Sequence, residues 1–239
     1  MKQNYRSRWA LALLALTFSA TASASTVYIQ FDPLYSAPIT VDRTVDGGGS
    51  WFGQDPGQFH FITQAGSPSN IPAAFYTFCI EPREFLNLGQ FVAYNEVPIE
   101  QGTTNIGGMG AAKANLIREF LYRNYSDFSV ALDVNTAAAI QVSLWEIVRE
   151  NSGTLNLDTG DVQYRSWSNM AVHDMANSML SGLTGNGPYL TNVDALAFSG
   201  TQDTLIQFAT TAPEPSTLVL AAAGLILVGL SRRRIRTTK

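Results

Sequence analysis

The sequence has a single cysteine, Cys79, and two histidines, His60 and His173, among its 239 residues. One cysteine cannot form an internal disulfide. Neither histidine has other ligating residues at a metal-site spacing, so we expect no metal and no cofactor. His60 alternates with phenylalanines, which favours a position on one face of a strand. The carboxylates include no pair that the sequence assigns to acid–base catalysis.

Basic residues are also scarce once the two ends of the chain are set aside. Of the 15 Lys and Arg residues, three lie in residues 1–24 and five in residues 213–239, which leaves seven for residues 25–212. That central stretch holds 18 of the 19 acidic residues, so its net charge is near −11, whereas the whole chain has −4. A domain of this charge repels polyanions, so nucleic acid is not an expected partner.

The N-terminus has the three parts of a secretion signal. Its first residues are basic, residues 9–18 are apolar, and Ala22 and Ala24 form a small-x-small cleavage site for signal peptidase. The apolar run is too short to span a bilayer as a stable helix. The pattern therefore predicts a cleaved signal peptide over residues 1–24 and export across the inner membrane.

The C-terminus carries a second pattern, which begins where two prolines interrupt regular structure, at Pro213, Glu214 and Pro215. Residues 218–230 are wholly apolar or glycine, and a basic cluster follows that includes Arg232, Arg233 and Arg234. As a helix this run rises about 20 Å, short of a hydrocarbon core of about 30 Å. It predicts a short transmembrane helix with its arginines on the cytoplasmic side. One interpretation is a simple tail anchor.

The order of these three parts resembles the PEP-CTERM sorting signal. In that family the tail is held in the inner membrane and removed by an exosortase, a membrane transpeptidase-like enzyme. The resemblance implies a signal peptide at residues 1–24, one domain at 25–212 and a sorting signal at 213–239. It also implies a protein of a Gram-negative envelope that contacts the inner membrane transiently and ends at the cell surface or outside the cell.

The central domain has strand patterns on both sides of a helical middle. Alternation and β-branched or aromatic content predict strands over residues 26–31, 58–64, 75–80, 192–198 and 203–209. Helical periodicity predicts helices over residues 111–125, 133–151 and 162–183, with Asp133 capping the second. The expected fold class is α+β, a β-sandwich or barrel with a three-helix insertion.

Cys79 and Gln141 are both unusual in their positions. A bare thiol is a liability in an exported protein. Gln141 is the polar member of a helical stripe that otherwise consists of Ala137, Leu144, Trp145 and Val148. A buried carboxamide without partners costs about 1–3 kcal/mol. One interpretation is that both residues belong to an ordinary core. The other is that the thiol attacks the carboxamide carbon and expels ammonia, which leaves an internal thioester.

The segments around both residues resemble the thioester domains of bacterial surface adhesins. In those domains the cysteine follows an aromatic residue and precedes an aliphatic and an acidic one, as in residues 78–81, and the glutamine lies in a helix similar to residues 139–145. The resemblance covers residues 75–151. It implies that Cys79 and Gln141 form the thioester, that Phe78 and Trp145 pack beside it, and that a partner amine opens it. Within the helix motif, three residues depart from the family pattern: Ile140, Ser143 and Leu144.

We therefore expect an exported surface protein that captures an amine-bearing protein or surface ligand once, for adhesion or matrix attachment, rather than a catalyst. One alternative is a non-covalent structural protein of an extracellular polysaccharide matrix, in which Cys79 and Gln141 are only core residues. Another is an acyl-transfer enzyme with Cys79 as its nucleophile, although neither histidine is placed by the sequence as its base.

Overall fold

The computed structural model describes residues 25–32, 41–44, 52–86, 89–165 and 169–208. The predicted signal peptide, with Ala22 and Ala24, and the predicted sorting segment from Pro213 onwards lie outside these ranges. Within the described ranges, no helix is long and apolar enough to cross a membrane.

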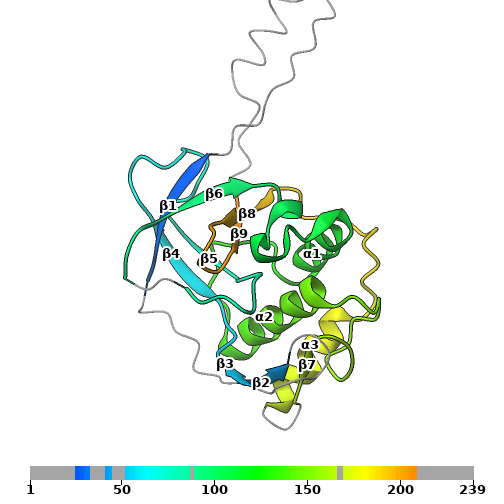
Figure 1. Ribbon diagram of the computed structural model, residues 1–239. Helices are drawn as coiled ribbons and strands as arrows, with labels where there is room; N and C mark the ends of the chain where they lie inside the picture. Colours follow the sequence, from blue (N-terminus) through cyan, green and yellow to red (C-terminus); the bar gives the residue numbers. More distant parts are fainter. Residues whose placement is uncertain (1–24, 33–40, 45–51, 87–88, 166–168, 209–239) are drawn as a thin grey trace, which may run out of the picture.

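A six-stranded antiparallel sheet forms one half of the domain (Figure 1). Its strands lie in the order β5 (Ala74–Thr77), β4 (Phe59–Thr63), β1 (Thr26–Phe31), β6 (Val92–Val97), β8 (Val193–Ala197) and β9 (Thr204–Gln207). The residues that follow β5 pair with β9. Leu205 N–H donates to Phe78 C=O at 3.1 Å, and Ile80 N–H donates to Asp203 C=O at 2.9 Å. These bonds bring the two edges together into a nearly closed barrel, so the predicted α+β class and the barrel are confirmed.

The helices cover one side of this barrel (Figure 1). They are α1 (Gly110–Asn124), α2 (Val134–Arg149) and α3 (Met170–Leu180), and two 3-10 turns, η1 (Ile99–Gln101) and η2 (Thr104–Ile106), lead from β6 into α1. Asp133 caps α2 as predicted, because its side chain accepts from the N–H groups of Asn135 and Thr136, both at 3.1 Å.

A second, three-stranded sheet lies beside α3, at the bottom of Figure 1. It consists of β3 (Phe52–Gln54), β2 (Val41–Thr44) and β7 (Gln163–Tyr164). This sheet corrects one prediction: the helix expected over residues 162–183 covers only 170–180. Residues 163–164 pair with β2 instead, and the Asn169 side chain caps α3 by accepting from Val172 N–H. β6 and the three strands of the small sheet were not predicted.

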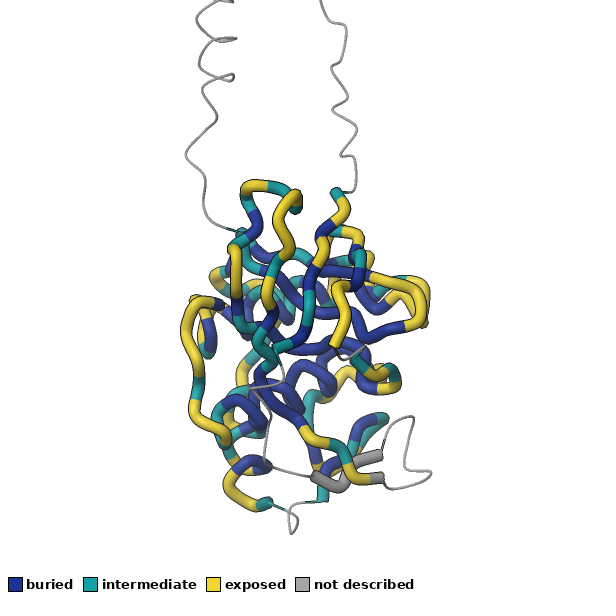
Figure 2. The backbone as a smooth tube through the Cα atoms, turned by 90° about the vertical axis from the view of Figure 1, so that its left-hand side faces the viewer, coloured by how far each residue is buried: buried dark blue, intermediate teal, exposed yellow. Residues whose placement is uncertain are grey.

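Two hydrophobic cores result, one inside the barrel and one between the barrel and the helices. Alternation along the last two strands separates them: Leu196 and Ile206 face the barrel interior, whereas Ala195 and Leu205 belong to the core shared with the helices. Helix α2 belongs to this second core, and every residue from 137 to 148 is buried. Figure 2 shows buried backbone running through the interior of the domain, with the exposed segments around it. This complete burial requires each of its polar side chains to find a partner inside the protein.

Candidate functional site

Cys79 lies at the seam where the barrel closes. Strand β5 ends at Thr77, earlier than the predicted strand over residues 75–80, and Cys79 forms an isolated bridge with Thr204. Its neighbours Phe78 and Ile80 belong to the core shared with the helices, whereas Phe75 lies in the barrel interior. Phe78 and Ile80 thus contribute to the core on the helix side, and Cys79 between them is wholly buried, with 0% of its surface exposed.

Gln141 extends from α2 to the backbone of Cys79. Its Oε1 accepts from Cys79 N–H at 3.0 Å, and its Nε2 donates to Cys79 C=O at 2.6 Å. Since the neighbouring Phe78 C=O and Ile80 N–H point to β9, the polar groups of Cys79 point away from β9. The carboxamide thus occupies the place that a neighbouring strand would take, and neither of its polar atoms is left unpaired.

Phe78 and Trp145 lie in one buried core. They are the two residues expected to pack beside Cys79 and Gln141. The Phe78 ring meets Tyr125 edge-on, with centroids 5.5 Å apart and planes at 90°. The Tyr125 hydroxyl accepts from Gln58 Nε2 at 2.6 Å and donates to Val130 C=O at 2.8 Å. This network fixes the aromatic wall on the helix side of the seam. Phe78 directly precedes Cys79, and Trp145 follows Gln141 by about one turn of α2; packing of either ring against the pair itself stays a prediction.

Two buried carboxyl groups that the sequence did not assign to the site lie close to Cys79. Glu81 is 1% exposed and Asp203 is 0% exposed. Glu81 accepts from Asp203 N–H at 3.1 Å and from Asn105 N–H at 2.9 Å. Asp203 in turn accepts from the N–H of Thr104 at 2.9 Å. The acidic residue two positions after the cysteine was a signal for Glu81, but Asp203 is far away in the chain and carried no such signal.

These groups form one electrostatic cluster. Burial raises the pKa of the Cys79 thiol well above its usual value, and the charges of Glu81 and Asp203 raise it further. Burial also raises the pKa of Glu81 to about 7, although the N–H of Asn105 opposes this. The pKa of Asp203 and that of the Tyr94 phenol are raised by burial too. At neutral pH the thiol is therefore protonated, and a protonated thiol is a poor nucleophile.

The two histidines have partners elsewhere in the domain. His60 lies on β4, where its Nδ1 is 3.0 Å from Asp32 and its ring is 4.7 Å from that of Tyr76. His173 lies on α3 between Asp158 and Asp174, each at 2.9 Å from one of its ring nitrogens. Among the residues that the structure describes, no group of three or more His, Cys, Asp and Glu side chains could hold a metal ion.

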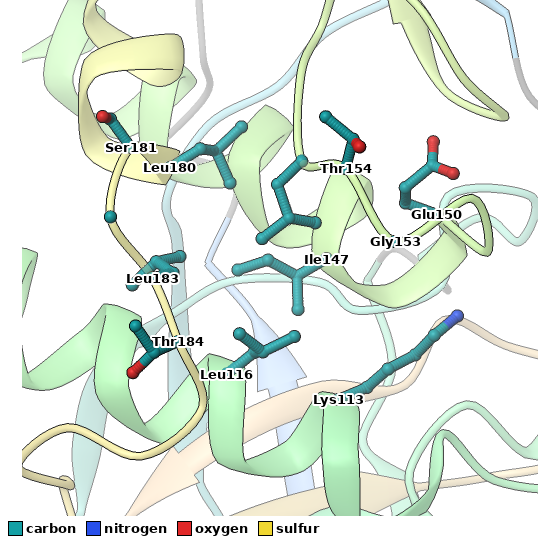
Figure 3. Close-up of a pocket in the computed structure, with 12 residues that line it drawn as sticks. Lys113, Leu116, Ile147, Glu150, Gly153, Thr154, Leu180, Ser181, Leu183 and Thr184 are labelled. Atoms are coloured by element: carbon teal, nitrogen blue, oxygen red, sulfur yellow. The ribbon is translucent and has the colours of Figure 1, made fainter.

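A pocket of about 450 Å³ opens between the helices and the loops that follow α2 and α3 (Figure 3). Its walls combine aliphatic and polar side chains, and Lys113 lies at one end of it. The Lys113 ammonium donates to Val148 C=O at 2.6 Å and to the Asn151 side chain at 3.1 Å, so it is hydrogen-bonded within the protein. Neither Cys79 nor Gln141 lines this pocket. The buried pair is thus separate from this cavity.

Comparison with known proteins identifies a sorting motif near the C-terminal end of the chain. Residues 211–234 match the PEP-CTERM protein-sorting motif, which confirms the sorting signal predicted from Pro213, Glu214, Pro215 and the arginines 232–234. No curated protein and no solved structure matches the chain. The chain thus carries the sorting motif that an exosortase processes, which points to an exported protein at the cell surface or outside the cell of a Gram-negative bacterium.

Proposed function

We propose that the domain is a thioester domain, in which Cys79 and Gln141 form an internal bond that captures a partner amine once. The observation that carries this proposal is the pair of hydrogen bonds between the Gln141 carboxamide and the backbone of Cys79. Two residues 62 positions apart in the chain are thereby held in direct contact, and both are wholly buried.

The orientation of the carboxamide suits attack by the thiol. Because the carboxamide bonds to both backbone groups of Cys79, it lies in the hydrogen-bonding plane of the strand. A side chain stands out of that plane, so the Cys79 thiol lies to one side of it. A nucleophile attacks a planar carbonyl from its face. The two hydrogen bonds thus hold the carboxamide next to the residue whose sulfur would attack it.

The same hydrogen bonds support the chemistry of ring closure. The sulfur–carbon bond forms, and negative charge develops on Oε1 of Gln141, which already accepts from Cys79 N–H at 3.0 Å. A fixed backbone N–H at this distance stabilises an oxyanion. The carbon–nitrogen bond then breaks, and Nε2 leaves as ammonia with the proton that the thiol has lost. The products are a thioester and one ammonia, with no external reagent.

The surroundings favour capture of an amine over hydrolysis. Cys79 and Gln141 are both 0% exposed, so bulk water does not reach the bond. A lysine amine of a partner would attack the thioester carbonyl, form an amide with the Gln141 side chain and release the Cys79 thiol. The net charge near −11 of residues 25–212 attracts cationic, lysine-rich surfaces. The domain acts once, because the amide product does not return to the thioester.

Intact mass of the non-reduced, folded protein tests this proposal. The wild-type protein is expected to weigh one ammonia less than its sequence, and methylamine should then add to Gln141. The variants Cys79→Ala and Gln141→Ala should keep the full mass of their sequences. Gln101→Ala, at an exposed glutamine, is the matched control and should still lose ammonia. A folded wild-type protein with its full sequence mass rejects the thioester.

A second candidate function rests on the same contacts. Two hydrogen bonds give each polar atom of Gln141 a partner, as they would in an ordinary core glutamine. In that case the domain is a non-covalent structural protein of the extracellular matrix, and Cys79 keeps a free thiol. Alkylation after denaturation separates the two candidates, because a free thiol reacts with iodoacetamide and a thioester sulfur does not.

A further inference from the structure

We infer that His173 is a pH-sensitive clasp, which holds the loop of residues 150–162 against α3 while both nitrogens of its ring are protonated. The inference is independent of the thioester, because it involves no bond to Cys79 or Gln141. The loop joins α2, the helix that carries Gln141, to β7 beside α3 at the bottom of Figure 1. A change at the clasp therefore acts on the segment that directly follows this helix.

Both ring nitrogens of His173 face a carboxylate. Nε2 is 2.9 Å from Oδ1 of Asp158 in the loop, and Nδ1 is 2.9 Å from Oδ1 of Asp174 on α3. An ionised carboxylate can only accept a hydrogen bond, so each contact requires an N–H on the ring. A neutral imidazole has one N–H, whereas an imidazolium has two. The arrangement is thus that of an imidazolium, although only 6% of the residue is exposed.

A neutral ring has a second arrangement within reach, because Asn177 lies one turn further along α3. Its Nδ2 is 3.3 Å from Nε2 of His173 and 3.4 Å from Oδ2 of Asp158. With its proton on Nδ1, a neutral ring still donates to Asp174, and its Nε2 accepts from Asn177. With its proton on Nε2, the bare Nδ1 would face the carboxylate of Asp174. Deprotonation therefore favours the first tautomer, in which Asp158 loses its bond to the ring.

The Asp158 contact is one of the ties that hold the loop. Next to it, Leu157 N–H donates to Oδ1 of Asn177 at 3.0 Å, and Asn156 N–H donates to Oε1 of Glu146 on α2 at 2.8 Å. These two bonds remain when the ring is neutral, so the loop loosens without leaving the domain. The loop also forms one wall of the pocket in Figure 3, through residues 150 and 153–155. Release of the clasp thus frees this wall to move.

The titratable groups around the ring set the direction of the pH dependence. Asp158 in the loop and Asp174 on α3 both favour the charged ring, and the Tyr164 ring on β7 lies 5.7 Å from it. Glu146 on α2 bonds the loop through Asn156 N–H, and burial raises the pKa of this carboxyl to about 8. The two bonds of the clasp are complete at low pH. The bond to the loop is lost as the pH rises through the range in which histidines release a proton, about pH 5–8.

Nitrogen-15 NMR of the folded, full-length chain in detergent solution reports the protonation of the ring directly. At about pH 5 both ring nitrogens of His173 should carry a proton, and at about pH 8 the proton should remain on Nδ1 and leave Nε2 bare. His173→Gln identifies the signals, because its spectrum lacks them. A ring with a single proton at pH 5, or a neutral ring that keeps its proton on Nε2, would overturn the inference.

Hydrogen exchange measures the effect on the loop, as protection factors corrected for the intrinsic pH dependence of exchange. Amides of residues 150–162 should open about three- to ten-fold more often at pH 8 than at pH 5. The effect is modest because 57% of the Asp158 side chain is exposed, so solvent weakens the bond.

Variants assign this difference to the clasp. His173→Gln and Asp158→Asn should each abolish it, and agreement between the two guards against a folding defect in one of them. Glu146→Gln should retain it, which excludes the other group that titrates beside the loop. The matched control His60→Gln, at the histidine that contacts Asp32, should retain it as well. An equal opening rate of the wild-type loop at both pH values, or a difference that persists in Asp158→Asn, would overturn the inference. Neither result bears on loss of ammonia, which tests the thioester separately.

Discussion

The contact between Gln141 and Cys79 is best measured where no covalent bond can form. Cys79→Ala removes the sulfur but keeps the backbone N–H and C=O that the carboxamide binds. We therefore compare Cys79→Ala with the double variant Cys79→Ala/Gln141→Leu. Leucine fills a similar volume and offers no polar group, so the difference in stability reports the two hydrogen bonds alone.

The structure sets the size of this difference. Both backbone groups of residue 79 are buried, and both lose their partner when Gln141 becomes leucine. Each buried polar group left unpaired costs about 1–3 kcal/mol, so the double variant should be less stable by about 2–6 kcal/mol. Domains of this size unfold with about 5–15 kcal/mol. Each kcal/mol lowers the melting temperature by about 2–4 °C.

Urea unfolding followed by circular dichroism gives the free energies, with equal m-values as the sign that the comparison is valid. The matched control is Cys79→Ala/Gln101→Leu, which alters an exposed glutamine and should stay within about 0.5 kcal/mol of Cys79→Ala. If Cys79→Ala/Gln141→Leu also stays within that margin, the carboxamide does not bind the backbone of residue 79, and the proposed site loses its basis.

Four further predictions concern the bond, two buried acids and the tail. If the thioester forms, it closes a loop of 62 residues, so wild type should exceed Cys79→Ala by about 4 kcal/mol in urea unfolding; a difference below about 1 kcal/mol would argue against it. Burial raises the pKa of Glu146 to about 8, so its stabilising contribution is complete below its ordinary pKa and is lost as the pH rises through about 8. Glu146→Gln should therefore raise the melting temperature at pH 9 and change it little at pH 4. Glu119 is buried and accepts from three backbone N–H groups of the loop at residues 182–187. Burial by itself would raise the pKa of Glu119, but these hydrogen bonds outweigh burial, so the net effect is a lowered pKa. Glu119→Gln should cost about 1–3 kcal/mol in urea at pH 7, and the wild-type advantage should vanish as the pH falls through the lowered pKa. Deletion of residues 213–239 should abolish exosortase processing, seen as a missing size shift of the cell-associated protein on immunoblots.

The first two helices were predictable because their own residues determine them. Periodic apolar residues and the cap at Asp133 located α2 to within two residues at each end. The third helix was extended too far because Gln163 and Tyr164 form a strand only when β2 lies beside them. Such pairing joins segments more than a hundred residues apart, and no local pattern encodes it.

The candidate site divides in the same way. The sequence singled out Cys79 and Gln141 because each was chemically out of place, and the structure brings them into contact. Asp203 was missed because its place beside Glu81 depends on closure of the barrel, which is a property of the whole sheet. The sequence also suggested a one-sided apolar stripe on α2, whereas the helix is buried on all sides between the barrel and its neighbours.

Because Cys79 and Gln141 are completely buried, the reactivity of the proposed thioester would depend on the stability of the folded domain. If the proposed thioester forms, an amine would reach it only in molecules whose core has opened locally, so the capture rate would be the intrinsic rate multiplied by the open fraction. Every 1.4 kcal/mol or so that stabilises the closed core should then slow capture about tenfold. A surface protein built in this way would wait in an unreactive form until contact with a partner, or a pull on the cell, shifts that balance. Its selectivity would come from what opens the domain as much as from what fits it.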